Sequence, residues 1–206
     1  MMARTLVVLV DDDDAARHSL QALLEMSGYR VDAYADGQAC LDHADVGAGC
    51  LITDIRMPGM DGLALHAEIA RRFPALPVIF ITGHGDVSLA VRGLKAGAVD
   101  FIEKPFEAEA MLSSVVRALA ISLDADRKKA EETLAQNKLA LLTPRQRQVF
   151  DCLVTGQATK DMAISLALSP RTIEIHRHEV MKRLKAGSVA DLTRLSFALA
   201  PHNKFD

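Results

Sequence analysis

The sequence is short of the features that mark membrane-inserted, secreted or disordered proteins. None of its apolar runs approaches the roughly 20 residues that a membrane-spanning helix needs. The first apolar run, residues 5–10, is too short for a signal peptide and leads directly into four aspartates. There is no low-complexity tract, and 50% of the residues are hydrophobic. We therefore expect a folded cytoplasmic protein with no membrane association.

Cysteines and glycine motifs are also scarce. The three cysteines, Cys40, Cys50 and Cys152, are odd in number and lack CxxC spacing, so free thiols in a reducing cytoplasm are expected. No GxGxxG motif follows the first apolar run, where aspartates stand instead. Aspartates there would repel a pyrophosphate, which counts against a nucleotide-binding module.

Charge is unevenly divided along the chain. Residues 1–124 hold 10 basic and 18 acidic side chains, whereas residues 125–206 hold 14 and 9. An acidic first part joined to a basic second part suggests two domains with different partners. The basic part is a candidate for binding nucleic acid.

The first 105 residues alternate short apolar runs with helical patterns. This alternation is typical of βαβ units, and continuous apolar runs fit parallel strands that are covered on both faces. We predict a doubly wound, five-stranded parallel sheet of the flavodoxin type. The expected strands are residues 5–10, 29–34, 50–53, 77–82 and 99–103, and the expected helices are residues 15–27, 39–44, 63–72 and 87–95.

A helical pattern begins at Glu107 and runs unusually far. Its apolar stripe thins over residues 124–138, which are highly charged and contain neither proline nor glycine. We interpret that stretch as a solvated helical linker. A coiled-coil pairing is an alternative, although Asp126 and Thr133 fall on its seam. The predicted division is residues 1–123, a linker of residues 124–141, and residues 142–206.

No strand-like run appears after Thr143. Thr143 and Ser169 are each followed by proline, which is the pattern of a helix start, and Gly156 and Gly187 are expected stops. Four short helices are predicted, and the third, from Pro170 to Lys185, is long and basic. A short helix, a tight connection and a longer basic helix form the helix-turn-helix pattern, so the third helix is expected to enter the major groove of DNA.

Polar side chains stand where the predicted strands end. Asp11 and Asp12 follow the first strand, Asp54 the third, Thr82 ends the fourth and Lys104 follows the fifth. The carboxyl ends of parallel strands meet at one edge of a sheet, which is where α/β proteins bind ligands. Neighbouring carboxylates repel one another and need a cation, and oxygen ligands suit Mg²⁺, or Mn²⁺ in its place.

This set of side chains predicts a site for a phosphoryl group. A carboxylate can act as nucleophile and become an aspartyl-phosphate, while the metal and Lys104 neutralise the charge on the transferred oxygens. A phosphatase with an aspartate nucleophile is the competing hypothesis. Haloacid-dehalogenase-like enzymes typically carry a second aspartate two residues after the nucleophile, and here that position is Arg56, which counts against turnover.

The motifs "VDDD", "TDIRMPGMDG", "ITGHGD" and "DFIEKPF" resemble the receiver domain of FixJ-like two-component response regulators. The resemblance implies that a sensor histidine kinase phosphorylates Asp54, and that Thr82 and Lys104 contact the phosphoryl oxygens. It also implies that Phe101 follows Thr82 as a conformational switch and that the peptide bond after Lys104 is cis. The implied Mg²⁺ ligands are Asp11, Asp12, Asp54 and the backbone carbonyl of Arg56.

The segment from "LTPRQRQVF" to "SPRTIEIHRHEVMKRL" resembles the LuxR/FixJ-type output domain. The whole then implies a phosphorylation-controlled transcription regulator rather than an enzyme. Promoter DNA, a homodimer formed on phosphorylation and RNA polymerase are its expected partners. The residues expected to face bases are Glu174, Ile175 and His178, and those expected to meet phosphates are Lys160, Arg171, Thr172, Arg177 and Lys182.

Three positions depart from the family pattern. Gln146 and Gln148 stand where the output domain often carries glutamate, and Thr159 stands where it often carries asparagine. These departures concern local packing and phosphate contacts rather than the fold.

Overall fold

The structure is a computed structural model that describes residues 6–43, 49–83, 91–93, 95 and 97–199. It divides into two compact units, one that ends at Asp126 and one that begins at Arg127. No helix in the described part of the chain is long and apolar enough to cross a membrane.

A five-stranded parallel sheet forms the centre of the first unit, with strand order β2-β1-β3-β4-β5. Every residue of β1, β3 and β4 is buried, as expected for apolar runs covered on both faces. The predicted sheet is therefore confirmed. The strands are β1 (Leu6–Val10), β2 (Arg30–Tyr34), β3 (Cys50–Asp54), β4 (Val78–Thr82) and β5 (Asp100–Glu103).

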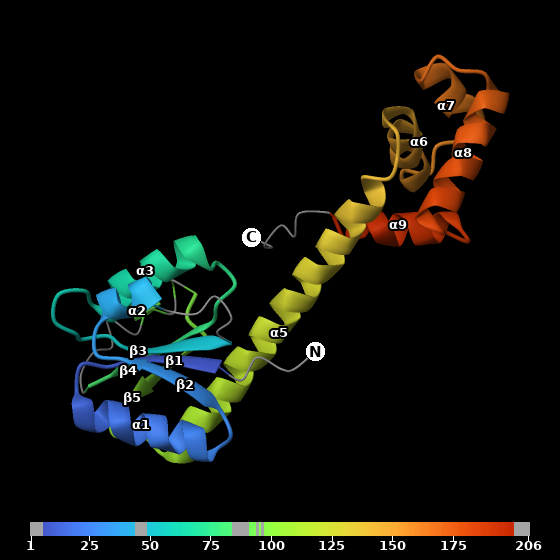
Figure 1. The fold of residues 1–206 in the computed structure, drawn as a ribbon. Coiled ribbons are helices and arrows are strands. Elements are labelled where there is room, and N and C mark those ends of the chain that lie inside the picture. The colour runs from blue at the N-terminus through green and yellow to red at the C-terminus, as the bar shows by residue number, and fades with distance from the viewer. Residues whose placement is uncertain (1–5, 44–48, 84–90, 94, 96, 200–206) are drawn as a thin grey trace. The chain divides into compact units, whose positions relative to one another are not determined.

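Helices cover both faces of this sheet (Figure 1). Alternate residues of β1 belong to two separate apolar clusters, one containing Val8 and the other Leu9, because successive strand side chains point to opposite faces. The helices of this unit are α1 (Asp14–Met26), α2 (Gly37–His43), α3 (Gly62–Arg72) and the first part of α5 (Ala108–Leu139). The predicted helix over residues 87–95 lies largely outside the described residues, although residues 91–93 and 95 are helical.

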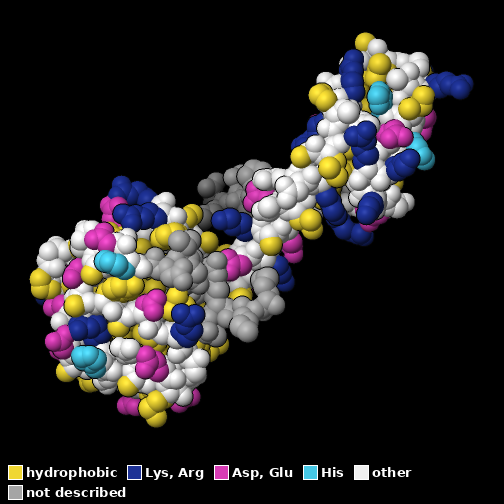
Figure 2. All heavy atoms as spheres, in the orientation of Figure 1, with side chains coloured by type: hydrophobic (Ala, Val, Ile, Leu, Met, Phe, Trp, Pro, Cys, Tyr) yellow, Lys and Arg dark blue, Asp and Glu magenta, His cyan; other side chains and the backbone are white. Residues whose placement is uncertain are grey.

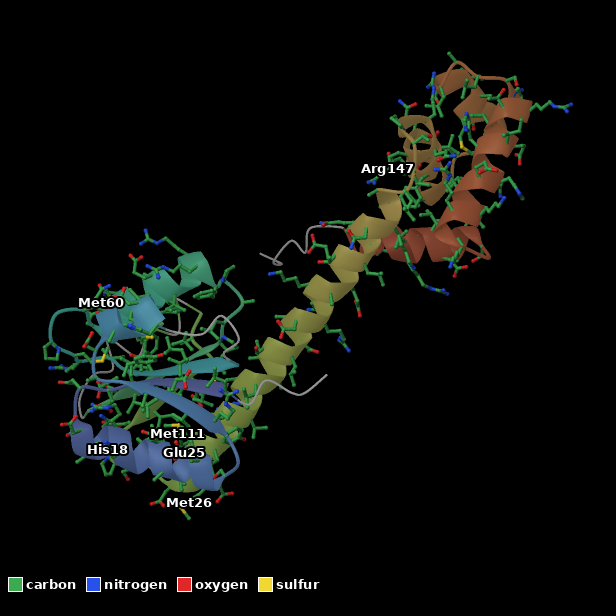
Figure 3. The ribbon with its side chains drawn as sticks, viewed as in Figure 1. His18, Glu25, Met26, Met60, Met111 and Arg147 are labelled. Carbon is green, nitrogen blue, oxygen red and sulfur yellow. The ribbon has the colours of Figure 1, made fainter. Side chains whose placement is uncertain are left out.

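The long helix α5 changes character along its length. Met111, Val115 and Ala118 are fully buried against the sheet, whereas Leu123 and Leu134 are exposed. Figure 3 contrasts the inward-pointing Met111 with Met26, which stands in solvent at the end of α1. The sequence prediction of a helix that continues from the first unit through a charged stretch is confirmed.

Four helices make up the described part of the second unit after α5: α6 (Pro144–Val154), α7 (Thr159–Ser165), α8 (Pro170–Leu184) and α9 (Val189–Phe197). Thr143 caps α6 and Ser169 caps α8, with a proline at the start of each helix, as predicted. Gln146 completes a capping box with Thr143, so this departure from the family pattern has a structural role. Phe150 and Ile173 are among the buried residues of the core that these helices share.

The buried cysteines lead to a chemical prediction. Burial, with a smaller contribution from the charge of Asp36, raises the pKa of Cys40 to about 12, and burial raises the pKa of Cys50 to about 12. Because the thiolate is the reactive form, iodoacetamide at pH 8 should alkylate half-buried Cys152 well before either of them. Peptide mass spectrometry measures the three rates. In urea all three should react alike, and equal rates for Cys50 and Cys152 in the folded protein would contradict the burial of Cys50.

Candidate functional site

Two carboxylates converge at the carboxyl edge of the sheet. Asp54 is the last residue of β3, and Asp11 directly follows β1, which pairs with β3 in parallel register. Both are buried, with 1% of Asp11 and 7% of Asp54 exposed. Two buried carboxylates repel each other when both are charged, so they need a nearby cation.

Lys104 supplies that cation. It follows β5, and its Nζ donates to Asp11 Oδ2 at 2.7 Å and to Asp54 Oδ2 at 2.6 Å. The bond between Lys104 and Pro105 is cis, as the family resemblance implied. One ammonium group thus joins Asp11, 93 positions before Lys104, to Asp54, 50 positions before it.

Backbone groups hold the remaining carboxylate oxygens. Asp11 Oδ1 accepts from the amide of Asp13 at 3.0 Å, and Asp54 Oδ1 accepts from the amide of Arg56 at 2.8 Å. Each carboxylate is therefore bonded through both oxygens. This arrangement restricts the orientation of the Asp54 side chain at the tip of its strand.

Burial and ion pairing act against each other on this cluster. Burial raises the pKa of Asp11 and outweighs the bonds from Lys104 and Asp13, which lower it. Burial would lower the pKa of Lys104, but its bonds to Asp11 and Asp54 outweigh burial and raise it. Both pKa values are therefore raised, with opposite consequences for charge: for Asp11 burial dominates and favours the neutral form, whereas for Lys104 the ion pairs dominate and favour the charged form. The pair is attractive, and the cost of burial falls mainly on Asp11.

Thr82 and Phe101 lie on the neighbouring strands. Thr82 ends β4 and is 1% exposed, and its hydroxyl donates to the Gly83 carbonyl at 3.2 Å. The half-buried Phe101 ring lies 6.4 Å from the ring of Phe80, whose other neighbour is His66, edge-on at 5.6 Å. Thr82 thus lies at the carboxyl end of β4, whereas Phe101 lies two residues before the end of β5, where it pairs with Phe80.

Asp100 ties Phe101 to helix α5. Its Oδ1 accepts from the Phe101 amide at 2.8 Å, and its Oδ2 accepts from Ser114 and Arg117 of α5. A change in β5 at Phe101 is therefore coupled by direct contacts to the first part of α5.

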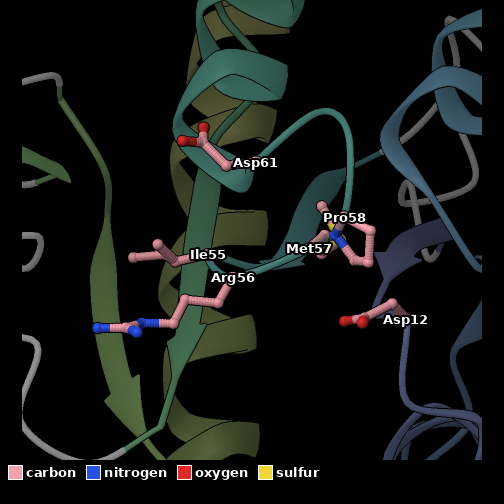
Figure 4. A pocket seen from close by; sticks show the side chains of 6 residues that line it. All are labelled: Asp12, Ile55, Arg56, Met57, Pro58 and Asp61. Carbon is pink, nitrogen blue, oxygen red and sulfur yellow. The ribbon is translucent and has the colours of Figure 1, made fainter.

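Asp12 is exposed and lines an open pocket beside the buried pair. Figure 4 shows Asp12 in this pocket, with the side chain of Arg56 extending away from it. No three His, Cys, Asp or Glu side chains are arranged to hold a metal ion among the residues that the structure describes. The structure brings Asp11 and Asp54 together on Lys104 and leaves Asp12 to one side. The residues lining the pocket are Asp12, Ile55, Arg56, Met57, Pro58 and Asp61.

A second candidate site lies on α8. Ile173 and Val180 are fully buried, whereas Ile175 is 57% exposed, so Ile173 belongs to the core and Ile175 lies on the surface. Glu174 and His178 are exposed as well, so all three residues expected to face bases are accessible. Lysine and arginine side chains gather over the visible face of the second unit (Figure 2). Among the residues expected to meet phosphates, Lys160, Arg171 and Lys182 are exposed and Thr172 and Arg177 are half-buried.

Comparison with known proteins identifies both units. Residues 7–116 match the response regulator receiver domain, and residues 140–196 match the luxR family of bacterial regulatory proteins. The transcriptional regulatory protein FixJ of Azorhizobium caulinodans is 44% identical over 191 residues, 92% of this chain and 90% of that protein. FixJ of Rhizobium meliloti is 42% identical over 195 residues, 93% of this chain and 95% of that protein.

The chain belongs to the FixJ-like response regulators.

Solved structures agree with this assignment. The response regulator StyR matches with a TM-score of 0.80 and 33% identity, covering 93% of this chain and 98% of StyR. Full-length FixJ from B. japonicum matches with a TM-score of 0.58 and 37% identity, covering 96% and 98%. The FixJ-like chain therefore combines a receiver domain with a LuxR-type DNA-binding domain, as the sequence motifs indicated. A receiver domain implies a sensor kinase as partner.

Sequence reasoning missed two residues that shape the receiver site. Arg17 donates through Nη1 to the Asp11 carbonyl at 2.7 Å and pairs with Asp14. The only sequence signal was an acid-base pair three residues apart at the start of α1. Gly62 begins α3, and its amide donates to the Ile55 carbonyl at 2.9 Å, which folds the loop after β3 back on itself.

Gly62 generates a prediction about the receiver domain. A Cβ on Gly62 would lie 2.2 Å from the Asp54 carbonyl oxygen, so alanine must push the backbone at the end of β3 aside. Gly62→Ala should lower the free energy of unfolding by about 1–3 kcal/mol. Both tyrosines of the chain, Tyr29 and Tyr34, lie in the receiver, so tyrosine fluorescence in a urea titration reports its unfolding alone.

Gly37→Ala is the matched control for this measurement. Its Cβ would meet the side chain of Met60 at 3.0 Å, and a flexible methionine can move. The control should lose clearly less stability than Gly62→Ala. Equal losses would show that the close approach to Asp54 does not constrain the loop.

Proposed function

We propose that this FixJ-like chain is a transcription regulator in which Asp54 accepts a phosphoryl group from a sensor histidine kinase. The observation that carries the proposal is the bridge from Lys104 to Asp11 and Asp54 at the carboxyl edge of the sheet. Residues 1–123 form the receiver, 124–141 the linker and 142–206 the LuxR-type domain. Access to promoter DNA requires a cytoplasmic location.

In the transfer step, a carboxylate oxygen of Asp54 attacks phosphorus, the oxygen–phosphorus bond forms and the bond to the donor's histidine nitrogen breaks. The receiver contributes by placing this carboxylate at a strand tip and by holding Lys104 next to it. Lys104 then stabilises the phosphoryl oxygens, and the Thr82 hydroxyl turns from Gly83 toward them. Hydrolysis of the aspartyl-phosphate returns the receiver to its first state, so the protein catalyses only its own modification.

The donor set fits a hard divalent cation. Mg²⁺ takes one or two carboxylates together with waters and phosphate oxygens, and Asp11 and Asp54 already converge. Asp12 lines the adjoining pocket and the Arg56 carbonyl belongs to the same loop, so these four residues are the proposed ligands of Mg²⁺ or Mn²⁺. When bound, the ion supplies charge neutralisation at the transferred oxygens.

Phosphorylation is proposed to shift a population of conformations toward one that dimerises. Movement of Thr82 toward the phosphoryl group leaves room for Phe101 to turn inward, and Asp100 passes this change to Ser114 and Arg117 of α5. A ligand shifts such an equilibrium only by binding the two states differently, and contacts made to the phosphoryl group provide that difference. The dimer then binds promoter DNA and contacts RNA polymerase.

Helix α8 is proposed to enter the major groove. Glu174, Ile175 and His178 face the bases, because they are exposed on the side opposite the buried Ile173 and Val180. Lys160, Arg171, Thr172, Arg177 and Lys182 meet phosphates, which gives affinity without sequence preference.

The decisive test of the receiver proposal is Asp54→Asn. An amide is a poor nucleophile and a weaker Mg²⁺ ligand, so the variant should take up no phosphoryl group from acetyl phosphate and Mg²⁺. Intact-mass spectrometry measures uptake. Asp42→Asn changes an exposed carboxylate on α2 and should behave as wild type. Uptake by Asp54→Asn equal to that of wild type would refute the assignment.

The DNA proposal is tested by changing one residue of each class. Arg177→Ala should weaken binding to every duplex and lower the salt slope by about one. Glu174→Gln should instead reduce discrimination at one base position by about 1–3 kcal/mol. Glutamine removes the negative charge but keeps the length of the side chain, so the space beside Arg177 stays filled. Fluorescence anisotropy at several salt concentrations separates the two; an identical loss on specific and scrambled duplexes for Glu174→Gln would contradict base contact.

A further inference from the structure

A threonine on α7 is bonded to a glutamate on α8. The hydroxyl of Thr159 donates to Glu174 Oε1 at 2.7 Å, although the two residues are 15 positions apart. Thr159 is half-buried where α7 packs against α8, and Glu174 stands on the exposed side of α8. The bond therefore crosses from the first helix of the turn motif to the helix proposed to enter the groove.

This hydroxyl is not used to cap its own helix. The N-cap position of α7 is Ala158, which makes no side-chain hydrogen bond to the helix, and Thr159 is the first helical residue. At the N-cap positions of α6 and α8, by contrast, the hydroxyls of Thr143 and Ser169 accept from backbone amides of those helices. The hydroxyl of Thr159 instead donates to a side chain of the neighbouring helix.

The bond limits how the glutamate can be presented. A free glutamate side chain samples many rotamers, whereas one held at Oε1 keeps its carboxylate near the N-terminus of α7. Within the described part of the second unit, the contacts of Glu174 with Thr159 and with Arg177 both fall on Oε1. Oε2 is then the oxygen directed to an outside donor, and an amino group on a base edge in the major groove is such a donor.

We propose that Thr159 is a specificity-determining residue that acts through Glu174. It positions the carboxylate so that Oε2 accepts a hydrogen bond from an exposed base amino group, with cytosine N4 as the best match. Thr159 itself contacts no base. The inference rests on the proposed function of α8 as the helix that reads the major groove.

The test is a selection from a randomised duplex library by the full chain, with and without acetyl phosphate and Mg²⁺, followed by sequencing. Thr159→Val removes the hydroxyl and keeps the shape. It should lower the preference at one base position about 2- to 10-fold, the range expected for one hydrogen bond, and at the same position that Glu174→Gln affects. Thr159→Ser keeps the hydroxyl and should restore the preference.

The double variant shows whether Thr159 acts through Glu174. Added to Glu174→Ala, Thr159→Val should change the selected sequences no further, because the side chain that it positions is already absent. Thr155→Val is the matched control, since the hydroxyl of Thr155 bonds only to carbonyls of its own helix among the described residues. The control should select the same sequences as wild type.

Three outcomes would overturn the inference. Thr159→Val could select the wild-type sequences with wild-type strength, its effect could add to that of Glu174→Ala, or it could weaken every duplex equally, as loss of a phosphate contact would. Each leaves the proposed function standing, because wild type still selects a sequence. If wild type selects none in either condition, the proposed function itself fails. Circular dichroism of each variant confirms that the helices are intact before selection.

Discussion

One ammonium group between two buried carboxylates is the interaction on which the receiver site depends. Asp11 and Asp54 have lost nearly all contact with water, and removing charge from water is costly unless it is paired. Lys104 satisfies both carboxylates at once, while backbone amides bond the other oxygens. A site held this way fixes both side chains at the carboxyl edge of the sheet. Under the proposed function, an arriving phosphoryl group would exchange contacts with Lys104 in a site that is already assembled.

The surrounding fold makes that pairing possible. Parallel strands put the ends of β1, β3 and β5 at one edge, and apolar runs long enough to fill both faces keep the sheet rigid beneath it. Gly62 lets the loop after β3 turn closely over the Asp54 carbonyl, and Arg17 holds the carbonyl of Asp11. In β5, the Asp100 side chain accepts hydrogen bonds from the Phe101 amide and from Arg117 of α5. Direct contacts therefore run from β5 to the first part of α5.

The LuxR-type domain positions its exposed residues through the packing of helices. Its helices share one apolar core, and α8 contributes Ile173, Val180 and Leu184 to it while its other side remains exposed. Because these residues occupy one side of α8, Glu174, Ile175 and His178 on the other side remain exposed. The hydroxyl of Thr159, on the preceding helix, restricts the exposed Glu174, and under our proposal this contact serves recognition as well as packing.

Periodicity, strand-end residues and cap motifs in the sequence determined the sheet, the long helix, the starts of α6 and α8, and the identity of Asp54, Thr82 and Lys104 as residues of one edge. These are local patterns or follow from the rule that parallel strands end together. Only the tertiary structure decided which side chains touch. It joined Lys104 to Asp11 and Asp54, left Asp12 beside the pair, buried Ile173 rather than Ile175, and bonded Thr159 to Glu174. The reason is physical: a hydrogen bond between residues far apart in the chain depends on side-chain direction and on packing to within an ångström, and neither is written in the spacing of residues along a sequence.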